Sequence, residues 1–217
     1  MTKDQIQETS LLKPIPHLSF DEASHTYTYK GKRIECSVTG VLSFDMKAEV
    51  RAAIERDRHN WEIRGNTVHN CMEAHLTGAA QLNPGDFAEH VEPLLAHPLM
   101  TNYKALAAEY RLVDKRCRYA GSFDALLTGA GRDGKQRTIL LDLKTLKHAH
   151  SPTRSVAAQC GAYLSMLAQW HPTIWVDQCV GLFSKPGVVE LVVHEPQDCL
   201  DAWDEQWGRF EAWSPAF

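Results

Sequence analysis

Residues 138–145, TILLDLKT, join the apolar run of a buried strand to an acid and a base near its end. Successive side chains of a strand point to opposite faces of the sheet, so Asp142 and Lys144 share one face and Leu141 and Leu143 share the other. Because functional sites are often built where strands end, this spacing predicts a core strand that presents a carboxylate and an ammonium group side by side.

The bulk composition indicates a folded protein of moderate size. The chain has 217 residues, of which 44% are hydrophobic, so one sizeable domain or two small ones can form and wholesale disorder is excluded. No apolar run approaches the roughly 20 residues that a membrane-spanning helix needs. The first ten residues, MTKDQIQETS, lack the basic and apolar regions of a signal peptide. We therefore expect a soluble intracellular protein with no membrane partner.

The six cysteines are scattered along the chain and include no CxxC pair. A zinc ribbon needs such pairs, so the pattern favours free thiols that are mostly buried. The cysteines therefore leave the expectation of an intracellular protein unchanged.

Charge is distributed unevenly along the chain. The net charge of −4 argues mildly against a nucleic-acid partner. However, residues 104–154 contain eleven Lys or Arg and five Asp or Glu, a balance of +6, whereas residues 155–217 contain two against eight, a balance of −6. The basic segment surrounds the DLK sequence, and it is either a solvated face with local ion pairs or a surface for phosphates.

The order of the predicted elements indicates one central mixed β-sheet flanked by helices, in an α/β or α+β fold. Residues 1–24 read as an N-terminal lead-in, loose up to residue 20, and residues 25–217 read as one domain. Turn sequences at Gly31, at 131–135 (GRDGK) and at 185–187 (KPG) indicate hairpins. Strands are expected at 107–114, 117–129, 138–145, 174–184 and 188–195, and helices at 37–42, 47–77, 154–170 and 198–213.

Caps and prolines predict where the helices begin and end. Ser37 is expected to cap a short helix, and one long helix or two abutting ones should end near Gly78. The segment 87–106 reads as helical, and Pro93 and Pro98 are predicted to break it.

A second acid is expected close to Asp142. Asp124 lies in the preceding strand, and a hairpin through 131–135 would place the two carboxylates side by side. Two close carboxylates repel each other unless a cation lies between them, and oxygen ligands suit Mg²⁺ or Mn²⁺. The carbonyl oxygen of Leu143 is a further candidate ligand. For the DLK sequence alone, the alternative is an ion pair between Asp142 and Lys144 at the strand end.

Further motifs, in order, resemble the PD-(D/E)XK nuclease superfamily, in the branch that contains RecB, Cas4 and the mitochondrial genome maintenance exonuclease. In that branch a helical histidine precedes an acidic strand, a (D/E)-x-K sequence and a Q-x-x-x-Y helix. The resemblance covers residues 25–195. The matching sequences are GNTVHNCMEAHL with His69, AEYRL with Glu109, GSFDAL with Asp124, LDLKT with Asp142 and Lys144, and QCGAY with Gln159 and Tyr163; SVTGVL resembles the segment before the first long helix.

This resemblance implies a restriction-endonuclease-like core and a role for each matching residue. His69, Asp124, Asp142 and the Leu143 carbonyl would bind the catalytic Mg²⁺ or Mn²⁺. Lys144 would assist the attacking water, and Glu109 would reach a second metal or support the ligands. Gln159 and Tyr163 would contact DNA or buttress the site. Basic residues expected along the DNA path are Arg116, Arg118, Lys147 and Arg154.

The function implied is a divalent-metal-dependent DNA nuclease of 25–217, acting in the cytoplasm of a bacterium or a phage-infected cell. An exonuclease or an enzyme that processes ends and flaps in recombination, repair or phage DNA metabolism is favoured. Its partners would be single-stranded DNA or duplex ends. No P-loop sequence is present, so no nucleotide cofactor is expected, and a recombination or helicase partner would be a separate protein. Only Cys179 and Cys199 fall late in the chain, so no iron–sulfur cluster is expected.

Two other functions stay open at the level of sequence. One is a nuclease-fold module that binds nucleic acid or a partner protein without cutting. The other is a metal-dependent hydrolase of a different phosphoester. Binding without cleavage, or cleavage of nucleotides and phosphosugars in place of DNA, would distinguish them.

Overall fold

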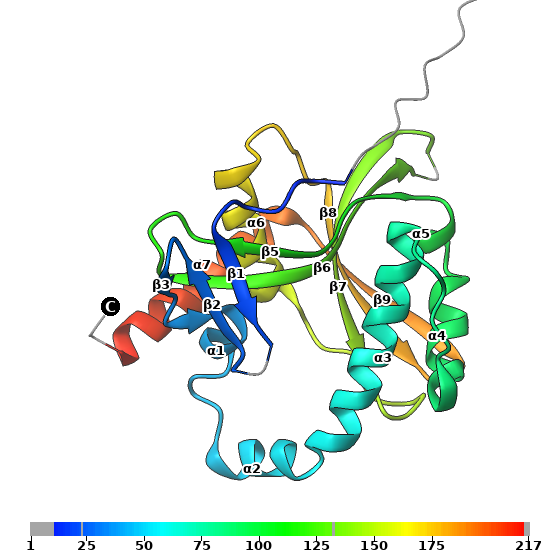
Figure 1. The fold of residues 1–217 in the computed structure, drawn as a ribbon, viewed down its shortest axis with the longest axis horizontal. Helices are drawn as coiled ribbons and strands as arrows, with labels where there is room; N and C mark the ends of the chain where they lie inside the picture. The colour runs from blue at the N-terminus through cyan, green and yellow to red at the C-terminus, as the bar shows by residue number, and fades with distance from the viewer. Residues whose placement is uncertain (1–10, 23, 132, 215–217) are drawn as a thin grey trace, which may run out of the picture.

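The computed structural model describes residues 11–22, 24–131 and 133–214, which form a mixed sheet with helices on both faces (Figure 1). The main sheet has the strand order β4-β6-β7-β8-β9, and β5 pairs with β6 beside this path. The pairs β4–β6 and β7–β8 are parallel, and the others are antiparallel. The strands are β4 (Cys36–Ser37), β5 (Lys104–Val113), β6 (Tyr119–Ala130), β7 (Gln136–Thr145), β8 (Gln178–Lys185) and β9 (Val188–His194).

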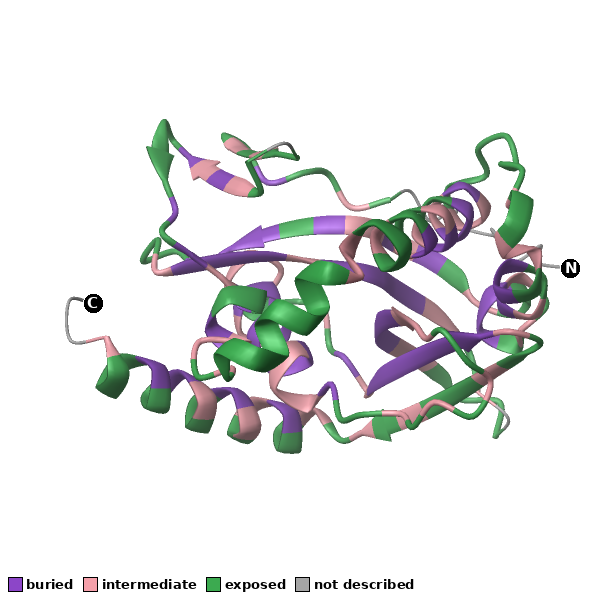
Figure 2. Ribbon diagram, turned by 90° about the horizontal axis from the view of Figure 1, so that it is seen from below, coloured by how far each residue is buried: buried purple, intermediate pink, exposed green. Residues whose placement is uncertain are grey.

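Two hydrophobic clusters cover the two faces of this sheet. On one face Leu140 packs with the side chains of α6 and α7, and on the other Leu141 packs with those of α3 and α4. The central strands are therefore largely buried (Figure 2). The helices are α1 (Val38–Leu42), α2 (Ala48–Arg56), α3 (Arg58–Thr77), α4 (Ala88–Leu95), α5 (Pro98–Thr101), α6 (Ala157–Trp170) and α7 (Pro196–Trp213), with a 3₁₀ turn at Gly85–Phe87.

Most of the predicted helix boundaries and turns are confirmed. Ser37 caps α1 by accepting a hydrogen bond from the amide of Gly40, at 3.0 Å. The helical segment before Gly78 consists of two abutting helices, and Gly78 ends the second with a left-handed φ of 70°. Hairpins turn at Gly31 and Gly187, both with positive φ. Helix α6 begins three residues later than predicted, at Ala157.

The N-terminal segment departs from the prediction of a loose lead-in. A small sheet of β1 (Leu18–Asp21), β2 (Thr26–Tyr29) and β3 (Lys32–Arg33) begins inside it. Ile15 is buried, and the amide of Leu12 donates a hydrogen bond to the carbonyl of Leu106 at 2.7 Å. The expectation that the chain is loose up to residue 20 is wrong from residue 11 onward, because non-local contacts order it; residues 1–10 lie outside the described part.

Pro93 does not break its helix, contrary to the prediction. Helix α4 continues through Pro93 to Leu95. A proline cannot donate to the carbonyl four residues earlier, which here is that of Glu89. The amide of Gly187, in the β8–β9 turn, donates to this freed carbonyl at 2.9 Å. The break does occur at Pro98, and β5 begins at Lys104, three residues before the predicted strand.

Two further expectations concern cysteines and membrane spans. All six cysteines are free, and all but Cys117 are buried, as the sequence predicted. Among the described helices, none has the length and apolar character needed to cross a membrane.

Helices α6 and α7 approach each other closely at Gly161. A Cβ atom at this position would lie 1.9 Å from the carbonyl oxygen of Cys199 on α7, so no larger residue fits without movement of the backbone. By contrast, a Cβ atom at Gly208, on α7, would meet nothing within 4 Å. The two glycines share a helical setting and differ in the space around them.

We expect Gly161→Ala to lower the free energy of unfolding by about 1–3 kcal/mol, because the added methyl group forces α6 and α7 apart. Gly208→Ala is the matched control and should raise it by up to about 1 kcal/mol, since alanine is the better helix former. Urea denaturation followed by circular dichroism measures both. Equal shifts in the two variants would contradict the close approach.

Candidate metal centre

Three side chains from distant parts of the chain converge at the centre of the sheet. His69 comes from α3, Glu109 from β5 and Asp124 from β6. The Nδ1 atom of His69 lies 3.0 Å from Oδ1 of Asp124 and 3.3 Å from Oε1 of Glu109, and the three potential ligand atoms all lie within 4.8 Å of one another. One imidazole nitrogen and two carboxylates form a donor set that fits a divalent cation.

A backbone hydrogen bond fixes the orientation of Asp124. The amide of Leu143, on β7, donates to Oδ2 of Asp124 in a short contact. The ladder between β6 and β7 is regular up to the pair Ala125–Leu141, so the next opposed positions are Asp124 and Asp142. The hairpin therefore brings the two aspartates together, as the sequence predicted. With one oxygen held by the backbone, the other oxygen of Asp124 faces His69.

Glu109 reaches the cluster through an unusual backbone conformation. Its φ is 44°, although it lies within β5 between the pairs Ala108–Ala125 and Tyr110–Phe123. A non-glycine residue with positive φ costs on the order of 1 kcal/mol or more and persists only where its surroundings impose it. Here regular strand pairs flank the residue on both sides. The resemblance assigned Glu109 to a second metal or to support of the ligands, and the structure places it in the group with His69 and Asp124.

Asp142 lies next to this group and contacts Lys144. Its Oδ2 atom is 2.7 Å from Nζ of Lys144, and Asp142 is buried. The ion pair that was the simplest alternative for the DLK sequence is thus present, and it adjoins the carboxylate of Asp124. The Asp142 carboxylate is not among the three groups that lie within 4.8 Å of one another.

Burial and neighbouring charges shift the pKa values of the cluster in opposite directions. Burial raises the pKa of Asp142 to about 6, with Lys144 opposing the shift and Asp124 adding to it. Burial also acts to raise the pKa of Asp124, but the His69 charge and hydrogen bond outweigh it and hold that pKa below its usual value. Burial raises the pKa of Glu109, and His69 opposes this. The pKa values of Asp124 and Asp142 therefore differ because His69 contacts Asp124, whereas burial dominates at Asp142.

The two basic groups of the cluster are held in their charged forms. Burial acts to lower the pKa of His69, but Asp124 and then Glu109 raise it to about 10. Burial likewise opposes the charge of Lys144, and Asp142 more than offsets this, so its pKa lies above the usual value. In the ion-free protein, protonated His69 therefore occupies the place of a cation between two carboxylates.

Gln159 and Tyr163 lie behind the cluster on α6. Nε2 of Gln159 donates to the hydroxyl of Tyr163 at 2.9 Å, and Tyr163 is buried. Burial and then the charge of Asp142 raise the pKa of Tyr163 well above its usual value. A Cβ atom at Gly121 would lie 2.9 Å from the Tyr163 ring, so the glycine gives the ring room. Of the two predicted roles for this pair, the geometry favours buttressing the site.

The predicted DNA-path residues divide into two groups. Lys147 and Arg154 are exposed in the segment between β7 and α6. This segment follows the end of β7 that carries Asp142 and Lys144. Arg116 and Arg118 lie in the turn between β5 and β6. At about 3.3 Å per strand residue, Arg118 is roughly 20 Å along β6 from Asp124. Arg118 is also paired with Asp114 at 3.0 Å.

Two residues near the site are not identified by any motif or periodicity in the sequence. Gly121 resembles any glycine in a strand, and its close contact with Tyr163 depends on how α6 packs on β6. Arg64 is a buried arginine on α3 within a helix of mixed polarity. Neither follows from a motif or a periodicity, so sequence reasoning missed both.

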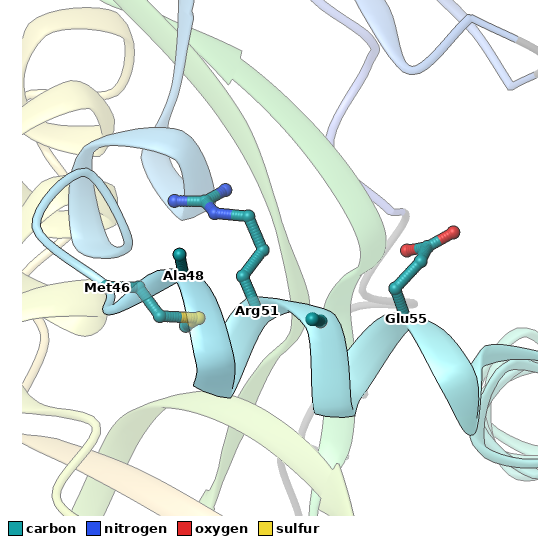
Figure 3. A pocket seen from close by; sticks show the side chains of 5 residues that line it. Met46, Ala48, Arg51 and Glu55 are labelled. Carbon is teal, nitrogen blue, oxygen red and sulfur yellow. The ribbon is translucent and has the colours of Figure 1, made fainter.

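A separate hollow lies against α2, away from the cluster (Figure 3). Its volume is about 530 Å³, and Nη2 of Arg51 beside it donates to the carbonyl of Ser43 at 2.9 Å. No residue of the candidate centre lines it. The lining residues are Met46, Ala48, Arg51, Ala52 and Glu55.

Comparisons with known proteins give little further information. No model of a known protein family matches the chain, and no curated protein matches it either. Among solved structures, one titled "Crystal structure of SSO0001" is similar at 13% sequence identity, over 79% of this chain and 74% of that chain, with a TM-score of 0.40. At this level of similarity the match supports no argument about function.

We expect about one proton to be released for each Mn²⁺ that binds near pH 7.5. The pKa of His69, about 10, lies above this pH, so the bound ion must displace the proton before the imidazole can act as a ligand. Binding should therefore tighten about tenfold per pH unit as the pH rises toward 10, and the slope should steepen below pH 6, where Asp142 also takes up a proton.

Isothermal titration calorimetry in buffers of different ionisation enthalpy counts the released protons. His69→Gln should abolish the release. His75→Gln is the matched control on the same helix, because His75 contacts the carbonyl of Met100 and lies outside the cluster. A proton count near zero in the unmodified protein would contradict the assignment.

Proposed function

We propose that this chain is a DNA nuclease that depends on Mg²⁺ or Mn²⁺ and hydrolyses phosphodiester bonds. The observation that carries the proposal is the convergence of His69, Glu109 and Asp124, with the Asp142–Lys144 pair on the adjoining strand. A cation-binding donor set beside the partly exposed ammonium group of Lys144 suits the hydrolysis of a phosphate ester.

We also propose a restriction-endonuclease-like core of the PD-(D/E)XK type. Its support is the order of the motifs together with their positions: a histidine on a long helix, acids on two antiparallel strands, and Gln159 and Tyr163 on the helix that follows. That helix, α6, connects the parallel strands β7 and β8. The whole of residues 25–217 would form this unit.

Each side chain of the cluster has a distinct task in the proposed reaction. A bound divalent ion would supply Lewis-acid catalysis and a bound water of lowered pKa. His69, Glu109 and Asp124 would hold the ion, with the Leu143 amide keeping Asp124 in place. Asp142, outside this group, would join them as a ligand from the adjoining strand. The Leu143 carbonyl would be a further ligand.

Lys144 would act as a donor of hydrogen bonds and positive charge. Its raised pKa keeps Nζ protonated near neutral pH, so it suits orienting the attacking water and neutralising charge that grows on the phosphate. Asp142, which lies 2.7 Å away, holds Nζ in position. A lysine that remains charged is less suited to removing the proton of that water.

The proposed substrates are single-stranded DNA and duplex ends, processed as by an exonuclease or a flap-processing enzyme. The exposed Lys147 and Arg154 beyond β7 support binding of a phosphate backbone near the cluster. A role in recombination, repair or phage DNA metabolism, a separate helicase or recombination partner and a cytoplasmic location belong to the same proposal.

We expect Asp124→Asn and Lys144→Ala each to reduce cleavage by a factor of about 10² or more, because they remove a metal ligand and a preorganised positive charge. The measurement uses end-labelled single-stranded, blunt and flapped DNA with Mn²⁺. Asp133→Asn is the control, since Asp133 lies in the β6–β7 turn and pairs with Arg137. Circular dichroism should give an unchanged fold for all three.

Full activity in either site variant would refute the nuclease assignment. Binding of DNA without cleavage in Mg²⁺ or Mn²⁺ would favour the silent binding module. Hydrolysis of nucleotides or phosphosugars in the absence of any DNA cleavage would favour a different phosphoesterase.

A further inference from the structure

Arg64, on α3, is buried and has no hydrogen-bond partner within the described part of the chain. The residue is 9% exposed, and its Nε atom is fully enclosed without a partner. Buried arginines are rarely found unpaired, and an unpartnered charge in a protein interior is costly. Such a group is a candidate for binding an anion that is absent from the ion-free, substrate-free protein.

The nearest acid does not neutralise Arg64. Asp57, at the start of α3, acts on the guanidinium only through space, because no ion pair joins them among the described residues. The Oδ1 atom of Asp57 instead accepts a hydrogen bond from Asn60 at 2.8 Å. Burial lowers the pKa of Arg64, yet an arginine stays charged at any working pH. A full positive charge therefore lacks a partner.

Arg64 lies where α3 meets the end of β7. A Cβ atom at Gly65, the next residue, would be 3.9 Å from Oγ1 of Thr145, which directly follows Lys144. His69 lies five residues further along the same helix, or about 7.5 Å along its axis. Arg64 thus lies on the turn of α3 that adjoins the end of β7 and the exposed segment that follows it.

Lys147 lies on the same side of the molecule. Lys147 follows Thr145 by two residues, and its charge, like that of Arg64, acts on the carboxylate of Asp57. Lys147 is exposed, whereas Arg64 is enclosed. A largely buried guanidinium together with an exposed ammonium group is suited to one phosphate that enters from solvent, because the guanidinium donates in a fixed fork and the lysine adds charge.

We propose that Arg64, with Lys147, forms a phosphate-binding subsite beside the metal centre, which holds a phosphate of the substrate strand next to the one that is cut. The identity of the ligand as nucleic acid rests on the proposed function; the anion site itself rests on the unpaired guanidinium. The phosphate is either an internal phosphodiester or a terminal phosphomonoester.

Fluorescence anisotropy tests the subsite in the full-length protein with Ca²⁺. The probes are single-stranded oligonucleotides with a 5′-phosphate, a 3′-phosphate or hydroxyls at both ends. We expect Arg64→Met to weaken binding about tenfold and to reduce the dependence of log K on log salt by about 0.7, the value for one phosphate contact on a single strand. Arg64→Lys should retain part of the affinity.

The free energy of unfolding separates binding from a structural role. Removing an unpartnered buried charge should leave stability unchanged or raise it, so Arg64→Met is expected to be at least as stable as the unmodified protein. The matched control is Arg137→Met, at the opposite end of β7, where Arg137 pairs with Asp133 at 2.7 Å. It should leave the salt dependence unchanged.

The three probes distinguish the source of the phosphate. A loss confined to one phosphorylated end assigns the subsite to a terminal phosphate, and an equal loss for all three assigns it to an internal phosphodiester. Destabilisation of Arg64→Met together with an unchanged salt dependence of binding in that same variant would overturn the subsite.

A titration with inorganic phosphate, followed by the NMR signal of the Arg64 Nε–H group, separates this inference from the nuclease proposal. A shift of that signal in a protein that neither binds nor cuts DNA retains the anion site and refutes the nuclease. DNA cleavage that is insensitive to Arg64→Met, with no shift on adding phosphate, refutes the subsite and retains the nuclease.

Discussion

The mutual repulsion of three neighbouring carboxylates, two of them buried and one partly exposed, governs the centre of this molecule. Glu109, Asp124 and Asp142 come from three neighbouring strands, and burial disfavours the charged form of each. His69 contacts the first two and Lys144 contacts the third, so two positive charges oppose three negative ones. If a divalent ion replaces the proton of His69, the formal charge of the cluster changes from −1 to zero. The ion-free arrangement is therefore prepared for a cation.

The rest of the fold keeps these groups in place at some local cost. Glu109 adopts a positive φ inside a strand, and the amide of Leu143 donates to the side-chain carboxylate of Asp124 on the neighbouring strand β6. Packing on both faces of the sheet makes these features tolerable, since the apolar residues beside them on β6 and β7 are completely enclosed. A strained residue persists only where the surrounding contacts hold it in place, and the middle of a sheet that is covered by helices on both faces provides such contacts.

The sequence predicted those parts of the fold and site that depend on local patterns. Strand alternation placed Asp142 beside Lys144, and the hairpin placed Asp124 opposite Asp142. It failed where distant contacts decide the outcome. Pro93 stays helical because Gly187 bonds the carbonyl that it frees. Arg64 escaped notice because the absence of a partner is a property of the folded chain and has no sequence signal.

The location of free positive charge, more than net charge, decides where this protein would hold a phosphate. The chain as a whole is negative, at −4, and an ion-bound cluster would be formally neutral, so neither attracts a polyanion strongly. Several arginines of the basic segment are already engaged: Arg118 pairs with Asp114 and Arg137 with Asp133. Positive charge that has no carboxylate partner, as at Arg64, interacts more strongly because it lies in a medium of low polarity. A phosphate that contacts such a group is drawn toward one end of β7, and therefore toward Lys144 and the aspartates that adjoin it.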